Sequence, residues 1–78
     1  MKIKINDMTS FELQGKEYIE LNKLLKIHNL VGSGGEAKVR IREEGEAKVN
    51  GEIETQVRKK LRAGDRVEFG GEVILVTA

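Results

Sequence analysis

The most informative stretch of this chain is residues 33–51, which read SGGEAKVRIREEGEAKVNG. Ser33 stands three residues before Glu36, the spacing of a capping box, so a helix is expected to begin directly after Ser33. Gly45 ends that helical segment. Asn50 and Gly51 form a strong signal for a type I′ hairpin turn, because both central residues of such a turn need positive φ. The stretch therefore predicts a helix that leads into a β-hairpin.

The segment before Gly32 predicts a first helix. Its apolar face follows the helical spacing i, i+3, i+4 and i+7 and consists of Leu21, Leu24, Leu25 and His28. We expect this helix to run from about Glu20 to Asn29. Ala37 on the second helix leaves room for a close approach, so the two helices should meet at a corner.

Short strands are expected around this helical pair. They comprise Phe11–Leu13, residues 47–49, a continuation at Ile53, the alternating pair Val67 and Phe69, and Val73–Val76. Gly64-Asp65 and Gly70-Gly71 predict turns. Residues 1–9 are expected to be a loose lead-in or an edge strand, and residues 10–78 a single domain. The predicted fold class is α+β, a two-helix corner packed beside a small, mostly antiparallel sheet.

Length and composition exclude several classes of protein. The chain has 78 residues, 38% of them hydrophobic and 35% charged, which suits a small core under a solvated surface and excludes large multi-layer enzyme folds. It has no Cys, so neither a disulfide nor a thiolate zinc site is expected. No apolar run approaches the ~20 residues of a membrane span, and we expect a cytoplasmic protein without membrane contact.

Few residues could support catalysis. The single histidine, His28, falls on the apolar face of the first helix, without a nucleophile beside it. Glu43 and Glu44 are adjacent on a helix, so their side chains diverge by about 100° and do not form an acid/base pair. The glycines before the second helix are not followed by the Lys-Ser pattern of a phosphate loop. We expect no enzymatic activity, no cofactor and no metal site.

Positive charge is concentrated in the middle of the chain. The net charge is only +1, but residues 31–62 carry eight basic and six acidic side chains. Lys38 and Arg42 should share one side of the second helix, whereas Arg40 should be neutralised by nearby Glu36, Glu43 and Glu44. Further positive charge comes from Lys48 and from the run Arg58, Lys59, Lys60 and Arg62. A merely solubilising role for these residues remains an alternative.

The order of three motifs resembles a known family. These motifs are ELNKLLK at 20–26, SGGEAKVRI at 33–41 and GEAKVNG at 45–51. They are similar to motifs of the RNA-binding domain named after the small-subunit ribosomal protein S-four, particularly its short stand-alone members of the YbcJ type. The resemblance covers residues 18 to about 69. It implies an αL motif and the binding of structured RNA by the two-helix corner and the hairpin.

The match can be followed residue by residue. The matching positions are Leu21, Lys23, Ser33, Glu36, Ala37, Val49, Asn50, Gly51, Gly64, Asp65 and Val67. Glu20 and Asn22 stand where the family usually has Arg and Asp, Gly34 stands where many members have Arg, and Glu46 adds a negative charge beside the hairpin. One extra residue lies between Ile41 and Gly45.

These arguments predict a set of RNA-binding residues. The set is Lys23, Ser33, Lys38, Arg42, Lys48, Asn50, Arg58, Lys59 and Lys60. The expected partner is structured RNA, with ribosomal or transfer RNA and a ribosome-associated role as candidates. Base stacking is expected to be minor, because Phe11, Tyr18 and Phe69 each have a plausible core or strand role. The alternative function is a protein-interaction adapter that uses the same face for a protein partner.

Overall fold

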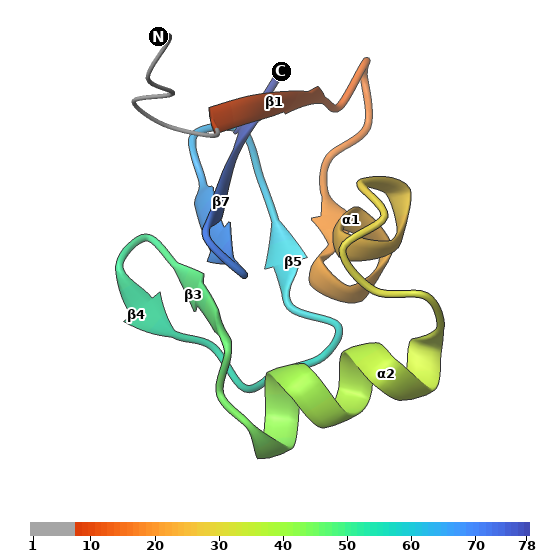
Figure 1. The fold of residues 1–78 in the computed structure, drawn as a ribbon. Helices are drawn as coiled ribbons and strands as arrows, with labels where there is room; N and C mark the ends of the chain where they lie inside the picture. The colour runs from red at the N-terminus through yellow and green to blue at the C-terminus, as the bar shows by residue number, and fades with distance from the viewer. Residues whose placement is uncertain (1–7) are drawn as a thin grey trace, which may run out of the picture.

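The computed structural model describes residues 8–78, which form a five-stranded sheet, a two-stranded ladder and two helices (Figure 1). The strands are β1 (Met8–Glu12), β2 (Ile19–Glu20), β3 (Ala47–Val49), β4 (Glu52–Ile53), β5 (Lys60–Leu61), β6 (Arg66–Phe69) and β7 (Glu72–Thr77). The sheet order is β1-β7-β6-β3-β4, and β2 pairs separately with β5. Every pairing is antiparallel except that of β1 with β7. The predicted α+β class with a mostly antiparallel sheet is confirmed.

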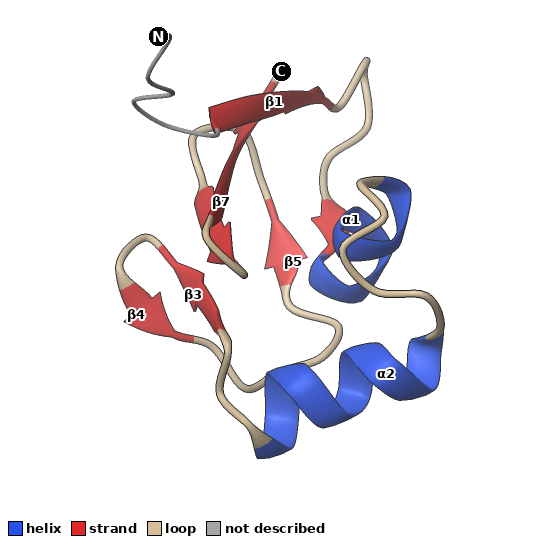
Figure 2. Ribbon diagram, viewed as in Figure 1, coloured by secondary structure: helices blue, strands red, loops and turns tan. Residues whose placement is uncertain are grey.

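The two helices meet at a corner beside the strands (Figure 2). The first is α1 (Leu21–Ile27), and the second is α2 (Gly34–Lys38), which continues into the π-helical turn η1 (Val39–Glu43). Helix α1 begins one residue later and ends two residues earlier than expected. Its end is explained by Asn29, whose φ of 59° is left-handed and cannot continue the helix.

The start of the second helix follows the predicted capping geometry in part. The Ser33 hydroxyl accepts a hydrogen bond from the Glu36 N–H at 3.1 Å, as expected. The Glu36 carboxylate accepts from the N–H of Gly32 at 2.8 Å, one residue before the position that a standard capping box uses. Both side chains thus stabilise the same helix start.

The π-helical turn changes how the second helix ends. The Glu44 N–H donates to the Val39 carbonyl five residues earlier, so this turn holds one residue more than an α-helical turn. From the resemblance we expected one extra residue between Ile41 and Gly45, and the wider turn at Val39–Glu43 overlaps that segment. Ile41 is fully buried in this turn.

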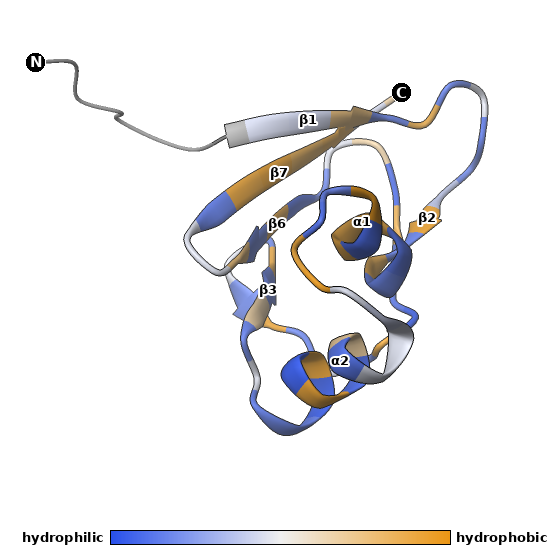
Figure 3. Ribbon diagram, turned by 45° about the vertical axis from the view of Figure 1, so that its right-hand side comes forward, coloured by the Kyte–Doolittle hydropathy of each residue, from blue (hydrophilic) through white to orange (hydrophobic). Residues whose placement is uncertain are grey.

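The core lies between the helix corner and the inner face of the sheet, and Figure 3 shows apolar residues along β7 and on α1. The buried residues are Leu13, Leu21, Leu24, Leu25, Val31, Ala37, Ile41, Ala47, Val49, Leu61, Val67, Phe69, Ile74 and Val76. Ala37 is completely buried, consistent with its expected role at the helix corner. Leu61 anchors the β2–β5 ladder to this core.

The predicted turns are present, but some pairings were not foreseen. Asn50 and Gly51 have φ of 54° and 89°, so the hairpin joining β3 to β4 has the positive φ values of a type I′ turn. Gly64 and the pair Gly70-Gly71 also have positive φ. Strand β1 begins at Met8, three residues before the expected strand, and so includes two residues of the predicted lead-in. Residues 1–7 of that lead-in lie outside the described residues.

Candidate nucleic-acid interface

Three basic side chains from distant segments meet at one surface depression, which we call the basic hollow. It has a volume of about 540 Å³ and is lined by Asn22, Gly34, Lys38, Arg42, Gln56, Val57 and Arg58. Lys38, Arg42 and Arg58 are all exposed. The first two come from the second helix, and the third comes from the loop before β5. The sequence predicted that Lys38 and Arg42 share one side of the second helix, and both residues line the hollow.

Backbone hydrogen bonds hold the loop that carries Arg58 against the start of α1. The Leu21 N–H donates to the Lys59 carbonyl at 2.9 Å, and the Asn22 N–H donates to the Val57 carbonyl at 3.0 Å. These bonds satisfy N–H groups that have no partner within the helix. The side chain of Val57 packs against the core. The position of Arg58 beside the second helix is therefore determined by the fold.

The cations of the basic hollow have no ion-pair partner within residues 8–78. The ion pairs in that part of the chain both belong to Arg40, which contacts Glu36 at 3.2 Å and Glu46 at 2.8 Å. Three exposed cations around one depression, each without an ion pair to any other residue in 8–78, produce a local positive potential that a chain with a net charge of +1 would not suggest.

Arg40 is neutralised as predicted, although by a different second partner. Its partners are Glu36 and Glu46 rather than Glu43 or Glu44, because the chain turns back after the π-helical turn. The hydrogen bond with Glu46 raises the pKa of the Arg40 guanidinium. The same hydrogen bond lowers the pKa of Glu46. Glu46 is consequently paired within the fold, and Arg40 offsets part of its charge beside the hairpin.

Arg40 also has contacts that sequence reasoning did not predict. Its guanidinium donates to the Leu30 carbonyl at 3.2 Å and lies 4.5 Å from the ring centroid of Phe69. Arg40 therefore joins the helix corner to the sheet.

Two of the predicted cations lie elsewhere. Lys59 and Lys60 line a second depression of about 460 Å³, together with Asn50 and the carboxylates of Glu52, Glu54 and Asp65. The Asn50 amide donates to Asp65 at 3.0 Å and accepts from the Arg66 N–H at 2.9 Å. These bonds tie the hairpin to the start of β6. The polar atoms of Asn50 are thus engaged within the fold.

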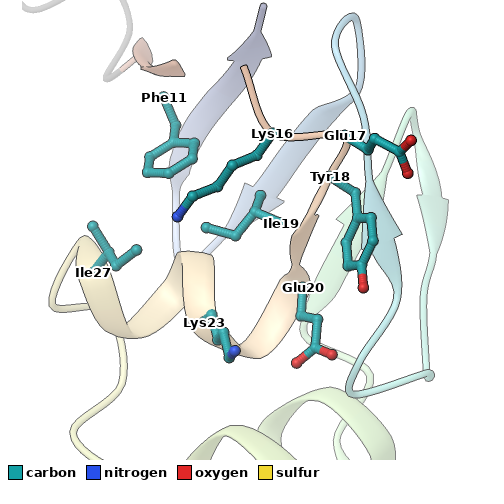
Figure 4. Close-up of a pocket in the computed structure, with 8 residues that line it drawn as sticks. All are labelled: Phe11, Lys16, Glu17, Tyr18, Ile19, Glu20, Lys23 and Ile27. Carbon is teal, nitrogen blue, oxygen red and sulfur yellow. The ribbon is translucent and has the colours of Figure 1, made fainter. Parts of the chain in front are cut away.

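The other predicted residues are dispersed. Lys23 lines a depression of about 500 Å³ beside α1, with Phe11, Lys16 and Ile27 (Figure 4). Ser33 is the N-cap residue of α2. Lys48 is exposed on β3, where it pairs with Ile53 on β4 and with Glu68 on β6. The structure therefore brings three of the nine predicted residues together at the basic hollow, namely Lys38, Arg42 and Arg58, and three others at the second depression, namely Asn50, Lys59 and Lys60.

Four lining residues of the basic hollow were not among the predicted site residues: Asn22, Gly34, Gln56 and Val57. Gln56 lies in a loop, where no periodic pattern indicates a side chain's direction. Asn22 was noted only as a departure from the family motif. Its Oδ1 atom is buried and has no hydrogen-bond partner in the described part of the chain, and Asn22 lines the hollow.

The only histidine has a packing role. The His28 ring lies edge-on to Phe11 at 6.2 Å between centroids, and its Nε2 atom is buried and has no hydrogen-bond partner among residues 8–78. Residues 8–78 contain no cluster of three or more potential metal-binding side chains. In the same part of the chain, no helix has the length and apolar character needed to cross a bilayer.

Comparison with known proteins identifies the family. A model of the S4 domain matches residues 11–77. The chain is 41% identical over 71 residues to "Putative RNA-binding protein YbcJ" of Escherichia coli (strain K12), covering 91% of this chain and all of that protein. It matches "Uncharacterized protein YbcJ" of Shigella flexneri to the same extent.

A solved structure supports the same assignment. The solution structure of YbcJ from E. coli is described as revealing an αL motif involved in RNA binding. It aligns with a TM-score of 0.71 and 38% identity, covering all of this chain and 98% of that one. Both the motif order and the fold thus agree with the resemblance seen in the sequence, and the chain belongs to the S4 domain family.

Proposed function

We propose that this chain binds structured RNA and that the basic hollow contacts the phosphate backbone. The observation that carries this proposal is the meeting of Lys38, Arg42 and Arg58 around one depression, without ion-pair partners among the described residues. The related E. coli protein is named "Putative RNA-binding protein YbcJ", which supports the same function for this chain.

The chemistry of the hollow suits phosphate better than bases. Lys and Arg side chains neutralise phosphates and release counterions, so affinity should fall steeply as the salt concentration rises. Double-helical RNA is recognised mainly through its shape, its phosphates and its 2′-hydroxyls. Small folded domains can read these features without a deep cleft. We therefore propose folded RNA of the ribosomal or transfer class as the ligand.

Binding is proposed to occur without catalysis. The packing of the half-buried His28 ring against Phe11 and the burial of its Nε2 atom support this, because a general base must reach the proton that it removes. Purified protein incubated with bound RNA should leave the RNA intact. Cleavage that co-purifies with the protein and disappears in His28→Ala would contradict this part of the proposal.

The binding proposal can be tested by gel shift with a folded RNA in about 50 and 200 mM salt. Wild-type protein should bind at the lower salt, and Arg58→Gln should bind more weakly. The matched control is Lys26→Gln, which removes an exposed charge from α1 outside the basic hollow. Equal losses in the two variants, or no binding of folded RNA by wild-type protein, would contradict the proposal.

The class of RNA requires a second experiment. Crosslinking in the native cell followed by sequencing of the attached RNA should recover ribosomal or transfer RNA. Recovery of other folded RNAs would leave the binding proposal intact and refute the proposed class.

A further inference from the structure

We propose that Tyr18, Lys60 and Arg62 form a second contact site that holds one unpaired nucleotide of the bound RNA. We call these residues the Tyr18 site. The base would stack on the Tyr18 ring, and the adjoining phosphate would lie between the two cations. This inference rests on the RNA binding proposed above and adds a contact outside the basic hollow.

Tyr18 differs from the other aromatic residues in its packing. Phe69 belongs to the core and is 2% exposed, and Phe11 packs against the core. Tyr18 is half-buried and is neither a core residue nor one of the apolar side chains packed against the core. The expectation that all three rings serve packing or strand formation therefore leaves the Tyr18 ring unexplained.

Two cations surround this ring. The Lys60 Nζ atom lies 5.0 Å from the Tyr18 ring centroid, and the Arg62 Cζ atom lies 5.7 Å from it. Neither cation forms an ion pair with another residue in 8–78. Both side chains are exposed, so they can exchange the weakly negative ring face for a phosphate.

The β2–β5 ladder places these side chains on one face. Glu20 pairs with Lys60 and Ile19 with Leu61, and successive side chains of a strand point to opposite faces. Leu61 is buried, so its neighbours Lys60 and Arg62 point outward. Figure 4 shows Tyr18 and Ile19 projecting to opposite sides of the chain. Because Leu61 anchors the ladder in the core, the opposite face of the ladder points outward as a platform.

The platform adjoins the basic hollow. Arg58, which lines the hollow, and Lys60, which contacts Tyr18, are separated by one residue. That residue, Lys59, is tied to the start of α1 through the hydrogen bond from Leu21. One RNA can therefore contact both sites, with a duplex at the basic hollow and an unpaired nucleotide at Tyr18.

The choice of a nucleotide follows from the two kinds of group present. An aromatic ring stacks on any base, and Lys with Arg binds phosphate, as in sites for single-stranded nucleic acid. Glu20 is the carboxylate opposite Lys60 on the ladder, and Glu52, Glu54 and Asp65 line the second depression together with Lys60 and Arg62. Among residues 8–78, none of these carboxylates forms an ion pair with either cation. A neutral or positively charged partner could stack on the Tyr18 ring but would offer no negative charge to Lys60 and Arg62.

Tyr18 provides its own probe, since it is the only tyrosine in the chain. Protein labelled with 3-fluorotyrosine gives a single ¹⁹F resonance from this ring. Two RNA hairpins of the same stem sequence are titrated, one fully paired and one with a single unpaired adenosine. The resonance should shift with the bulged hairpin and change little with the paired one. An unchanged resonance at saturation with bound bulged hairpin would overturn the proposal.

Affinity measurements with variants provide the second arm. Tyr18→Leu should lose at least about fivefold in affinity for the bulged hairpin, the lower range of a base–aromatic stack, whereas Tyr18→Phe should retain it. Affinity for the paired hairpin should not change in either variant. If wild-type protein binds both hairpins but Tyr18→Leu behaves like wild type, only the Tyr18 site is refuted. If wild-type protein binds neither, the proposed function fails and the Tyr18 site with it.

Discussion

Replacing Gly34 with Arg should strengthen RNA binding. Gly34 is the first residue of α2 and lines the basic hollow beside Lys38 and Arg42. A Cβ atom added at Gly34 would meet no atom within 4 Å, and its φ is not in the left-handed region. The substitution therefore adds a fourth cation to the hollow without a steric conflict.

The expected gain follows from counterion release. One added phosphate contact should steepen the slope of log affinity against log salt by roughly 0.7 to 0.9. If the two proteins bind RNA equally well at 1 M salt, Gly34→Arg should bind about five- to eightfold more tightly than wild-type protein at 0.1 M salt. Stability should not fall, since Arg is a better helix former than Gly.

The assay is RNA affinity across a salt series for wild-type protein, Gly34→Arg, Gly34→Gln and Gly35→Arg. Gly34→Gln tests the longer side chain without its charge. Gly35→Arg adds the same charge at the neighbouring residue, which does not line the hollow. Equal gains for both Arg variants would show that charge anywhere on the helix suffices. No gain for Gly34→Arg would refute the placement of phosphate in the hollow.

Three further predictions concern residues with defined roles in the fold. Gly51→Val should reduce the free energy of unfolding by at least about 1–2 kcal/mol and weaken RNA binding with it, because Gly51 has a φ of 89°, which strains a residue with a Cβ atom. Loss of RNA binding at an unchanged melting temperature would instead identify Gly51 as a contact residue. Arg40→Leu should reduce the free energy of unfolding by about 1–2 kcal/mol through the lost Leu30 hydrogen bond and Phe69 contact. Its RNA affinity should stay near the wild-type value, and a loss like that of Arg58→Gln would contradict the assignment. The pKa of Glu36 is lowered below its ordinary 4.5, mainly by the hydrogen bond from the Gly32 N–H and then by that from Arg40. The ionised Glu36 carboxylate therefore stabilises the fold above pH 4.5, and this stabilisation is lost as the pH falls through the lower pKa of the folded state. The melting temperature of wild-type protein should therefore fall more steeply than that of Glu36→Gln on acidification below about pH 4.5.

Features with a local signal were predictable from the sequence. The cap at Ser33, the hairpin turn at Asn50-Gly51 and the helix carrying Leu21 each depend on residues within one or two turns of chain. The same holds for the neutralisation of Arg40 by Glu36, which is four residues away. Such local preferences are consistent with the final fold, which is why they could be recognised.

Features that depend on distant residues were not predictable in the same way. The parallel pairing of β1 with β7 joins residues 8–12 to residues 73–77, and no local pattern specifies it. The direction of the loop before β5 depends on hydrogen bonds to α1. That loop places Arg58, rather than Lys59 or Lys60, beside Lys38 and Arg42. A basic run in the sequence therefore indicated the charge but not which side chain enters the site.

The central claim is that the basic hollow binds phosphate, and its most direct test is the salt dependence of RNA affinity in the triple variant Lys38→Gln, Arg42→Gln, Arg58→Gln. The control triple variant removes the same charge at Lys16, Lys26 and Arg66, outside the hollow. We predict that the slope of log affinity against log salt becomes shallower by roughly 2 to 3 in the first variant and by clearly less in the control. An unchanged slope in a folded first variant, or an equal decrease in both variants, would contradict the account.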